Sequence, residues 1–530
     1  MAKDESAPAA ELFPSTETAS KAETATPDDG SASEKRDSDV ESGKYETSGM
    51  DSETEKSNLV TWEGPDDPAN PKNWSNSRKW TSAILISCFA FICPLSSSMA
   101  APALNKIGDD LGIPENSLEL QLVLSIFVLA YSFGPLVLSP CSEVWGRTRI
   151  IKFGNLLFIV FNTACGFAKT EAQITAFRLI AGFGGSATLG MGAGVISDCW
   201  NAEERGRGMS IYQLAPVLGP AVGPIAGGLI VSHTTWRWTF WTITIFNVAI
   251  QIGAAIFLKE TYAPRLLLLK ARKLRAETGN NQLQTKWEKD GRTLTKLVGK
   301  ALTRPWRFLA TQPIIQLLAL YQAMNYGLLY LMIASFPSLW EGRYGMSTSI
   351  ASLNYISLAL GSLIGAQVCG PLIDATHRRL KKRHGLGPDE PGLPEFRIPI
   401  MIPAAIITPC GIFLYAWSAE YKVHWIVPNI GAVLFAGGSM VSYQCIQTYV
   451  VDCYTTHAAS ASAASAFLRS LAAFSFPLFA PYLVHNLGYG WGGSVLGFVA
   501  VVLGIPAPLL FWKYGKAIRE FSFKYIGNDG

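Results

Sequence analysis

The sequence predicts an all-α membrane protein with twelve transmembrane helices arranged as two six-helix bundles. The chain has 530 residues, of which 49% are hydrophobic and only 16% are charged, whereas a soluble protein carries about 25% charged residues. Apolar runs long enough to cross a bilayer recur from Trp80 onward. One long polar stretch, 259–312, separates six of these runs from the other six. These observations exclude a soluble enzyme, a disulfide scaffold and a fibrous protein.

Residues 1–79 are predicted to form a disordered, acidic, Ser-rich cytoplasmic tail. They hold 18 of the 40 acidic residues and almost no large apolar residue before Leu59, so they cannot bury enough surface to offset the entropy of ordering. The end of the tail, 60–74, contains regularly spaced Trp and Pro residues and is expected to form a short ordered lead-in against the membrane surface. The first ten residues lack the apolar run of a cleaved signal peptide.

The body of the chain divides into spans of about 20 or more residues, the length that crosses the hydrocarbon core. The predicted spans are 80–104, 118–139, 150–168, 172–198, 208–232, 236–258, 313–340, 349–372, 397–417, 424–447, 459–485 and 490–513. The predicted domains are an N-terminal bundle (80–258), a cytoplasmic central loop (259–312), a C-terminal bundle (313–514) and a cytoplasmic C-terminal tail (515–530).

The distribution of basic residues predicts the orientation. The N-terminal tail, the even-numbered loops and the C-terminus hold 37 of the 44 Lys and Arg residues, so both termini of this multi-pass protein are expected in the cytoplasm. The membrane expected for it is the plasma membrane. Because the basic runs adjoin hydrophobic spans, no nucleic-acid partner is expected. The nine Cys and six His residues show no C-x-x-C pair and no paired ligand spacing, so neither a metal nor a cofactor is expected.

A short motif occurs in corresponding loops of the two halves. Between spans 2 and 3 the chain reads Ser-Pro-Cys-Ser-Glu143-Val-Trp-Gly-Arg147-Thr-Arg149, and between spans 8 and 9 it reads Gly-Pro-Leu-Ile-Asp374-Ala-Thr-His-Arg378. Each copy has a small residue, a proline, an acid and then an arginine at the same spacing. Parallel repeats of this kind occur in one of the transporter architectures. The alternative is a solvated loop whose positive charge only sets orientation.

Span 5 contains an unusual density of glycine and proline. Such residues are tolerated in a membrane helix, where they permit close helix contact and a bend. Ordinary packing of small residues is the alternative to a specific motif. The residues of the motif are Gly219, Gly223, Pro224, Gly227 and Gly228.

The spacing in span 5 resembles the antiporter signature of the major facilitator superfamily, and the chain resembles the fungal twelve-span drug:proton antiporters of that family. The repeated loop motif, Arg178-Leu-Ile-Ala-Gly-Phe-Gly184 in span 4, Asn70-Pro-Lys-Asn-Trp74 and Lys259-Glu-Thr-Tyr262 carry the resemblance from about residue 60 to the C-terminus. It implies the major facilitator fold. Departures are Ser139 and Cys141 in the loop motif and Ser210 in span 5, and they weaken the transfer of mechanism residue by residue.

The resemblance also assigns roles. It implies that Arg178 takes part in proton transfer, and that Glu143, Arg147 and Arg149, with Asp374 and Arg378, form a gating charge cluster that holds the two halves together on the cytoplasmic side. An intramembrane arginine usually faces the bundle interior, although Arg178 and, similarly, Arg469 could instead extend to the membrane surface. Since no Asp or Glu falls in the middle of a predicted span, proton coupling rests on the resemblance and on Arg178.

Polar and aromatic residues within the spans are candidates for the lining of a central cavity, although hydrogen bonding between helices is the alternative for each. The main candidates are Gln121, Gln213, Asn325, Tyr326 and Gln444, and the others are Ser97, Ser98, Gln322, Asn354, Tyr443 and Gln447.

The function implied is export of amphipathic toxic compounds, either drugs or a secondary metabolite, by proton antiport with alternating access. The chain lacks G-x-x-x-x-G-K-[ST], so an ion gradient is favoured over nucleotide hydrolysis. The expected partners are a small amphipathic molecule, protons and the lipid bilayer, and the protein is expected to act as a monomer. It is not expected to be an enzyme. The alternative is a proton-coupled uptake permease for a nutrient or a polyamine on the same fold.

Overall fold

The computed structural model describes residues 58–114, 117–200, 205–289, 294–385, 392–454 and 458–524, most of which are helical. The helices before the central loop are α2 (Asn76–Met99), α3 (Leu104–Leu111), α4 (Leu118–Trp145), α5 (Arg147–Cys165), α6 (Glu171–Gly185), α7 (Ala187–Cys199), α8 (Arg205–His233) and α9 (Arg237–Phe257). The predicted central loop contains α10 (Ala263–Thr278), α11 (Lys286–Lys289) and α12 (Leu294–Thr311).

The second half repeats this helical pattern. Its helices are α13 (Pro313–Pro337), α14 (Thr348–Leu353), α15 (Tyr355–Arg383), α16 (Met401–Glu420), α17 (Ile426–Cys453), α18 (Ala458–Val499) and α19 (Pro506–Lys524). Short 3₁₀ or π turns are η1 (Pro71–Asn73), η2 (Ala101–Ala103), η3 (Ser338–Arg343), η4 (Pro394–Arg397) and η6 (Ala500–Gly504). The prediction of an all-helical membrane protein is confirmed.

Each of the twelve predicted spans falls on a helix. Among the described residues, nine helical stretches are long and apolar enough to cross a membrane, and α8 is a tenth if its two segments, bent by 41°, count as one span. The third predicted span, α5, is a 19-residue helix outside this set, because Arg149, Lys152 and Asn155 lower its hydropathy. The stretch Ser460–Phe523 contains the last two predicted spans, and the chain breaks between them at Gly488, where φ is +70°.

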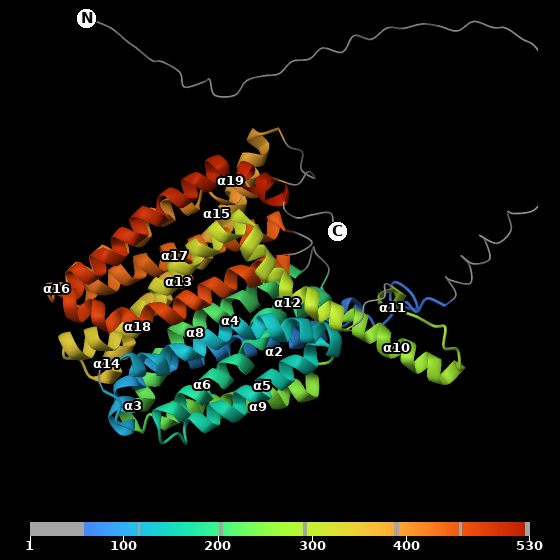
Figure 1. Cartoon of the computed structure of the whole chain (residues 1–530), viewed down its shortest axis with the longest axis horizontal. Helices are drawn as coiled ribbons and strands as arrows, with labels where there is room; N and C mark the ends of the chain where they lie inside the picture. The colour runs from blue at the N-terminus through green and yellow to red at the C-terminus, as the bar shows by residue number, and fades with distance from the viewer. Residues whose placement is uncertain are drawn as a thin grey trace, which may run out of the picture. The chain divides into compact units, whose positions relative to one another are not determined.

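The helices of each half pack mainly on one another (Figure 1). In the first half α2 packs against α8 and α9, and α6 packs against α4 and α5; in the second half α13 packs against α18, and α17 packs against α15 and α16. Contacts between the halves come from α4 with α18, and from α8 with α14 and α15. The described residues from Asn58 onward form one compact unit. Because the two halves are in contact, the structure does not divide them into separate units. The boundaries 80–258 and 313–514 remain our proposal for two bundles, and the packing of helices within each half supports it.

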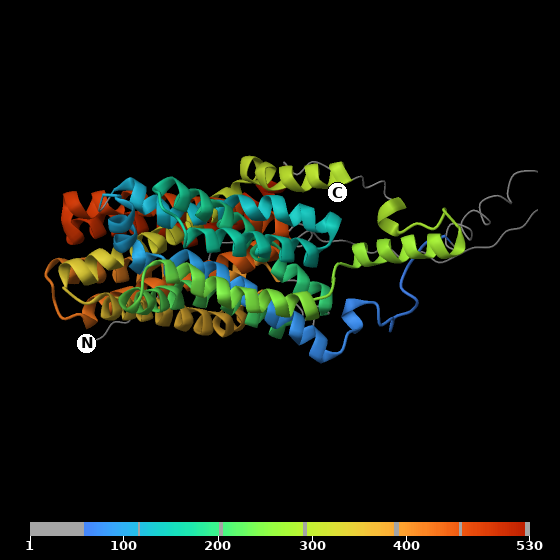
Figure 2. The same cartoon turned by 90° about the horizontal axis from the view of Figure 1, so that it is seen from below.

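Residues 58–74, here called the lead-in, are ordered, and they pack against the central loop. The backbone N–H of Val60 donates to the carbonyl of Gln284 at 2.8 Å, and Lys270 on α10 lies 3.0 Å from the Glu63 carboxylate and 3.7 Å from that of Asp67. The lead-in and α10 lie side by side in Figure 2. Helix α2 then begins at Asn76, four residues before the predicted start. The rest of the predicted tail, 1–57, lies outside the described residues.

Asp67 organises the lead-in, and its replacement by alanine is expected to loosen that segment. Its carboxylate accepts the backbone N–H groups of Glu63 and Ala69 at 3.0 and 2.8 Å. These bonds, chiefly the one from Glu63, hold the pKa of Asp67 below its ordinary value. The stabilisation is therefore complete at neutral pH and is lost only as the pH falls below about 3.9. Amide hydrogen exchange across 58–74 should be faster in Asp67→Ala at pH 7; unchanged exchange would contradict this role.

Candidate functional site

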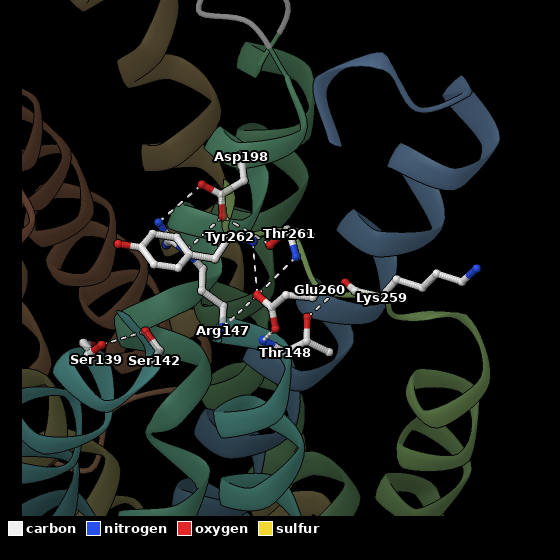
Figure 3. A network of polar contacts seen from close by, with 9 residues as sticks. All are labelled: Ser139, Ser142, Arg147, Thr148, Asp198, Lys259, Glu260, Thr261 and Tyr262. Atoms are coloured by element: carbon white, nitrogen blue, oxygen red, sulfur yellow. Dashed lines mark hydrogen bonds and ion pairs between the residues drawn. The ribbon is translucent and has the colours of Figure 1, made fainter. Parts of the chain in front are cut away.

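Arg147, the arginine of the first loop motif, forms an ion pair at the end of the first-half helices. Its Nε atom lies 2.9 Å from Oδ2 of Asp198, the penultimate residue of α7 (Figure 3). The hydroxyl of Thr261 donates to the same carboxylate oxygen at 3.2 Å, and the Arg147 guanidinium lies 5.2 Å from the Tyr262 ring centroid. A cation over an aromatic ring adds a modest attraction. Arg147 is thus held by α7 and by the segment that follows α9.

Glu260 holds the start of α5. Its carboxylate accepts the backbone N–H groups of Arg147 and Thr148 at 2.9 and 3.2 Å, which are donors that a helix N-terminus leaves unsatisfied. The positive end of the helix also favours a carboxylate at this position. Gly146, with φ at +97°, lets the chain turn sharply, and a Cβ there would collide with the Glu260 carboxylate. Glu260 therefore fixes the geometry that presents Arg147 to Asp198.

The structure thus brings the loop motif, the end of α7 and the Lys259-Glu-Thr-Tyr262 segment together. The contacts of Arg147 with Asp198, Glu260 and Tyr262 lie within the first half and the start of the central loop, and none of these three reaches the second half. Glu143 and Arg149, which the sequence placed in the same cluster, are exposed. Sequence reasoning assigned no role to Glu260, although its motif was recognised, because only the fold shows that this segment reaches the N-terminus of α5.

Replacing Glu260 with alanine is expected to destabilise the protein by about 1–2 kcal/mol, since it removes a charged cap from α5. The melting temperature of the detergent-purified protein should fall. Glu277→Ala is a matched control, because Glu277 is exposed and its i,i+4 pair with Lys273, at 3.6 Å, contributes at most a few tenths of a kcal/mol. Equal melting temperatures for the two variants would show that Glu260 is not a structural cap.

The second half has a corresponding charge network, but Arg378 is not part of it. Arg397, at the end of η4, lies 3.1 Å from the Asp374 carboxylate and 2.9 Å from that of Asp452 at the end of α17. Arg378 is exposed on α15. The loop between spans 8 and 9 is longer than the loop between spans 2 and 3, so the arginine that precedes the next span lies further along the chain. Beside it, Arg519 on α19 pairs with the buried Glu395 at 3.1 Å.

Arg178 is buried inside the first half. Only 1% of it is exposed, and its Nη2 atom donates to the carbonyls of Ser97 and Leu124 at 3.4 and 3.3 Å. The guanidinium lies 5.1 Å from the Phe127 ring centroid and 5.7 Å from that of Phe240. Its Nε and Nη1 atoms have no hydrogen-bond partner in the described part of the chain. A cation in a membrane helix costs about 2.5–3.5 kcal/mol, so this position points to function rather than to stability.

A chain of contacts leads from Arg178 to a second arginine in the other half. The hydroxyls of Ser97 on α2 and Tyr330 on α13 are 3.1 Å apart, and the Tyr330 and Tyr326 rings lie 5.2 Å apart. The guanidinium of Arg469 on α18 lies 5.0 Å from the Tyr326 ring and 5.1 Å from that of Tyr443 on α17. We call these six residues the central cluster: Ser97, Arg178, Tyr326, Tyr330, Tyr443 and Arg469.

The remaining cavity candidates have different environments. Gln121 is buried, and its Oε1 atom lacks a partner among the residues described. The side chain of Asn325 donates to the Tyr321 carbonyl of its own helix at 3.2 Å. Gln213 is exposed and Gln444 is half-buried. The sequence named Tyr326 and Tyr443 but not Tyr330, because helical spacing alone does not show which tyrosines face an arginine on another helix.

The glycines of the span 5 motif line two helix contacts. A Cβ at Gly219 would lie 2.9 Å from the Leu95 backbone N, and one at Gly223 would lie 2.7 Å from the Leu95 carbonyl, so α8 approaches the backbone of α2 at these positions. Gly227 continues this face against Met99. Gly228 points elsewhere, since its Cβ would collide with Ser352 on α14 in the second half. Pro224 lies in the same helix, in the second of its two segments.

Comparisons with known proteins agree with this arrangement. A family model described as Major Facilitator Superfamily matches residues 86–477. The efflux pump vrtL of Penicillium aethiopicum is 45% identical over 93% of this chain and 97% of its own length, and an uncharacterized transporter of Schizosaccharomyces pombe is 44% identical over 89% and 95%. The xylose transporter XylE of E. coli, in a partially occluded inward-open conformation, superposes with a TM-score of 0.60 at 16% identity over 83% of this chain and 98% of that chain. The chain therefore belongs to the major facilitator superfamily.

Proposed function

We propose that the protein exports amphipathic toxic compounds, either drugs or secondary metabolites, from the cytoplasm by proton antiport. The observation that carries this proposal is the similarity to proteins named efflux pumps. Besides vrtL, the efflux pump radE of Floropilus chiversii is 39% identical over 87% of this chain and 85% of its own length. The span 5 glycines, which the resemblance associates with antiporters, support the same direction of transport.

Alternating access is the proposed mechanism. The proposed bundles, 80–258 and 313–514, would rock about their shared contacts, in which α4 packs on α18 and α8 packs on α14 and α15. Glycines in α8 let it approach α2 and Ser352 closely. The ion pairs of Arg147 and Arg397 would hold the cytoplasmic ends of each bundle in shape while the bundles move.

Arg178 is the proposed coupling residue. Coupling requires that protonation and substrate favour opposite conformations, each through its differential affinity. The Nε–H and Nη1–H groups of this buried guanidinium have no partner among the residues described. They can bind an acceptor in one conformation and lose it in the other, so the guanidinium can respond to both protonation and substrate. The proposed location is the plasma membrane with both termini in the cytoplasm, and the proposed unit of transport is a monomer.

Retention of labelled compounds in a pump-deficient yeast tests this function. A panel of hydrophobic compounds would be followed with and without a protonophore, in cells expressing the full chain or Arg379→Ala, a control that alters an exposed arginine on α15. The expected result is that cells expressing either protein retain less of the compounds than the pump-deficient parent cells do. The protonophore should abolish this difference. Higher uptake, or retention that ignores the proton gradient, would contradict export and favour the uptake permease.

A further inference from the structure

We infer that the central cluster recognises an anionic aromatic group, a carboxylate or phenolate carried on a flat ring. This inference rests on the proposed function and narrows its substrate class. The six residues come from α2, α6, α13, α17 and α18, so they connect the two halves whose relative movement transport requires. A ligand held between them would contact both halves at once.

The cluster carries two positive charges that no described carboxylate neutralises. Neither Arg178 nor Arg469 has an ion pair within the described ranges, and Nε of each lacks a hydrogen-bond partner there. The acids at the span ends pair with other arginines: Asp198 with Arg147 at 2.9 Å, Asp452 with Arg397 at 2.9 Å, and Glu420 with Arg343 at 3.8 Å. A ligand carboxylate would supply the missing acceptor and form charge-assisted hydrogen bonds.

Besides the two arginines, the side-chain amide of Gln322 is a third hydrogen-bond donor, and it lies one helical turn from the cluster. Gln322 precedes Tyr326 by four residues on α13, and Ser465 precedes Arg469 by four residues on α18, so each lies on the same face as its neighbour in the cluster. The Ser465 hydroxyl donates to Gln322 Oε1 at 2.6 Å. The Nε2 amide of Gln322, which is 3% exposed, therefore remains a donor without a described partner. The unpaired groups here are donors, as an anion requires.

The aromatic residues define the other half of the ligand. The Arg469 guanidinium lies 5.0 Å from the Tyr326 ring centroid and 5.1 Å from that of Tyr443. All three side chains are half-buried, whereas Tyr330 is 4% exposed and Arg178 is 1% exposed. Arg469 and its two tyrosines are thus the accessible part of the cluster. Offset stacking on tyrosine suits a flat ring, and the adjacent guanidinium suits the acid attached to it.

The same charges disfavour a cation. A polyamine or protonated amine placed beside Arg469 would meet a like charge in a medium of low dielectric, where repulsion is stronger than in water. A neutral compound would gain stacking but would leave the donors unpaired. The expected order of affinity is therefore anion, then neutral molecule, then cation.

Three probes with one ring system test this order: 1-naphthaleneacetate, its methyl ester and 2-(1-naphthyl)ethylamine. Binding of each labelled probe to the full-length protein in nanodiscs would be measured at pH 7. The acid should bind at least tenfold more tightly than the ester, which corresponds to about 1.4 kcal/mol, and the amine should bind most weakly. Arg469→Gln should weaken the acid about tenfold and change the ester less than twofold; Arg469→Lys should retain part of the preference. Arg379→Gln, at an exposed site, is the control.

The wild-type preference decides the inference even if Arg469→Gln fails to fold. Equal or tighter binding of the ester, no measurable binding of the acid, or equal weakening of all three probes by Arg469→Gln would each overturn it. Efflux of the ester and the acid from proteoliposomes separates this failure from that of the proposed function. Proton-driven efflux of the ester without preference for the acid would overturn only the inference. Absence of proton-driven efflux for every bound probe would overturn proton-driven export instead.

Discussion

Arg178→Gln is expected to abolish proton-driven export while leaving the protein folded. The substitution removes a buried cation whose Nε and Nη1 atoms lack described partners, so it relieves a cost of about 2.5–3.5 kcal/mol instead of breaking an ion pair. The glutamine amide can still donate to a neighbouring carbonyl. Initial rates of gradient-driven efflux in proteoliposomes should fall at least tenfold, with a melting temperature equal to or above that of the wild type.

Arg178→Lys is the informative companion to this variant. It keeps the charge but loses the planar group that donates to the Ser97 and Leu124 carbonyls and lies over the Phe127 ring. Partial activity would assign the coupling role to the charge, and complete loss would assign it to the geometry of the guanidinium. Wild-type rates in Arg178→Gln would contradict any coupling role for this residue.

Gly228→Ala is expected to block transport by keeping α8 and α14 apart. A Cβ at this position would collide with the Ser352 side chain and lie 3.2 Å from the Thr348 carbonyl, so the contact between the halves seen here could not form. The bundles should then remain separated at this end, and efflux should fall at least tenfold although substrate still binds. Ser352→Gly in the same chain removes the colliding atoms and should restore efflux.

Gly299→Ala on α12 is the control for this variant, because Gly299 lies outside the motifs and a Cβ there meets no atom within 4 Å. An alanine in a helix is otherwise favourable by about 1 kcal/mol relative to glycine, so this control should be folded and active. If Gly228→Ala transports at the wild-type rate, or if Ser352→Gly fails to restore it, the contact between α8 and α14 is not required for transport.

The fold could be predicted from the sequence because the order of apolar runs and polar breaks along the chain defines the helices. Apolar runs and breaks give the helices, and Gly488 falls in the break predicted between the last two spans. The helices of the central loop were not predicted from the sequence, since α10 and α12 are not apolar throughout. The packing of the lead-in was not predicted either. The attachment of the lead-in depends on single contacts such as that of Lys270 with Glu63.

The candidate site was predictable only in part, because pairing across helices depends on how each helix is rotated. The sequence identified Arg178 and Tyr326, which the structure connects through Ser97 and Tyr330. It named Arg469 but could not show that two tyrosines from different helices contact it. The repeated loop motif likewise indicated Arg378, whereas a longer loop places Arg397 beside Asp374.

Proton movement caused by substrate is the measurement that tests the central claim most directly. The full-length protein would be reconstituted into liposomes that contain a pH-sensitive dye, with an imposed pH gradient and 1-naphthaleneacetate methyl ester, a probe that carries no proton across the membrane itself. The account predicts that the gradient drives the probe against its own concentration difference, and that added probe dissipates the gradient in wild-type but not in Arg178→Gln liposomes. Probe movement that neither responds to the gradient nor alters it would contradict proton antiport.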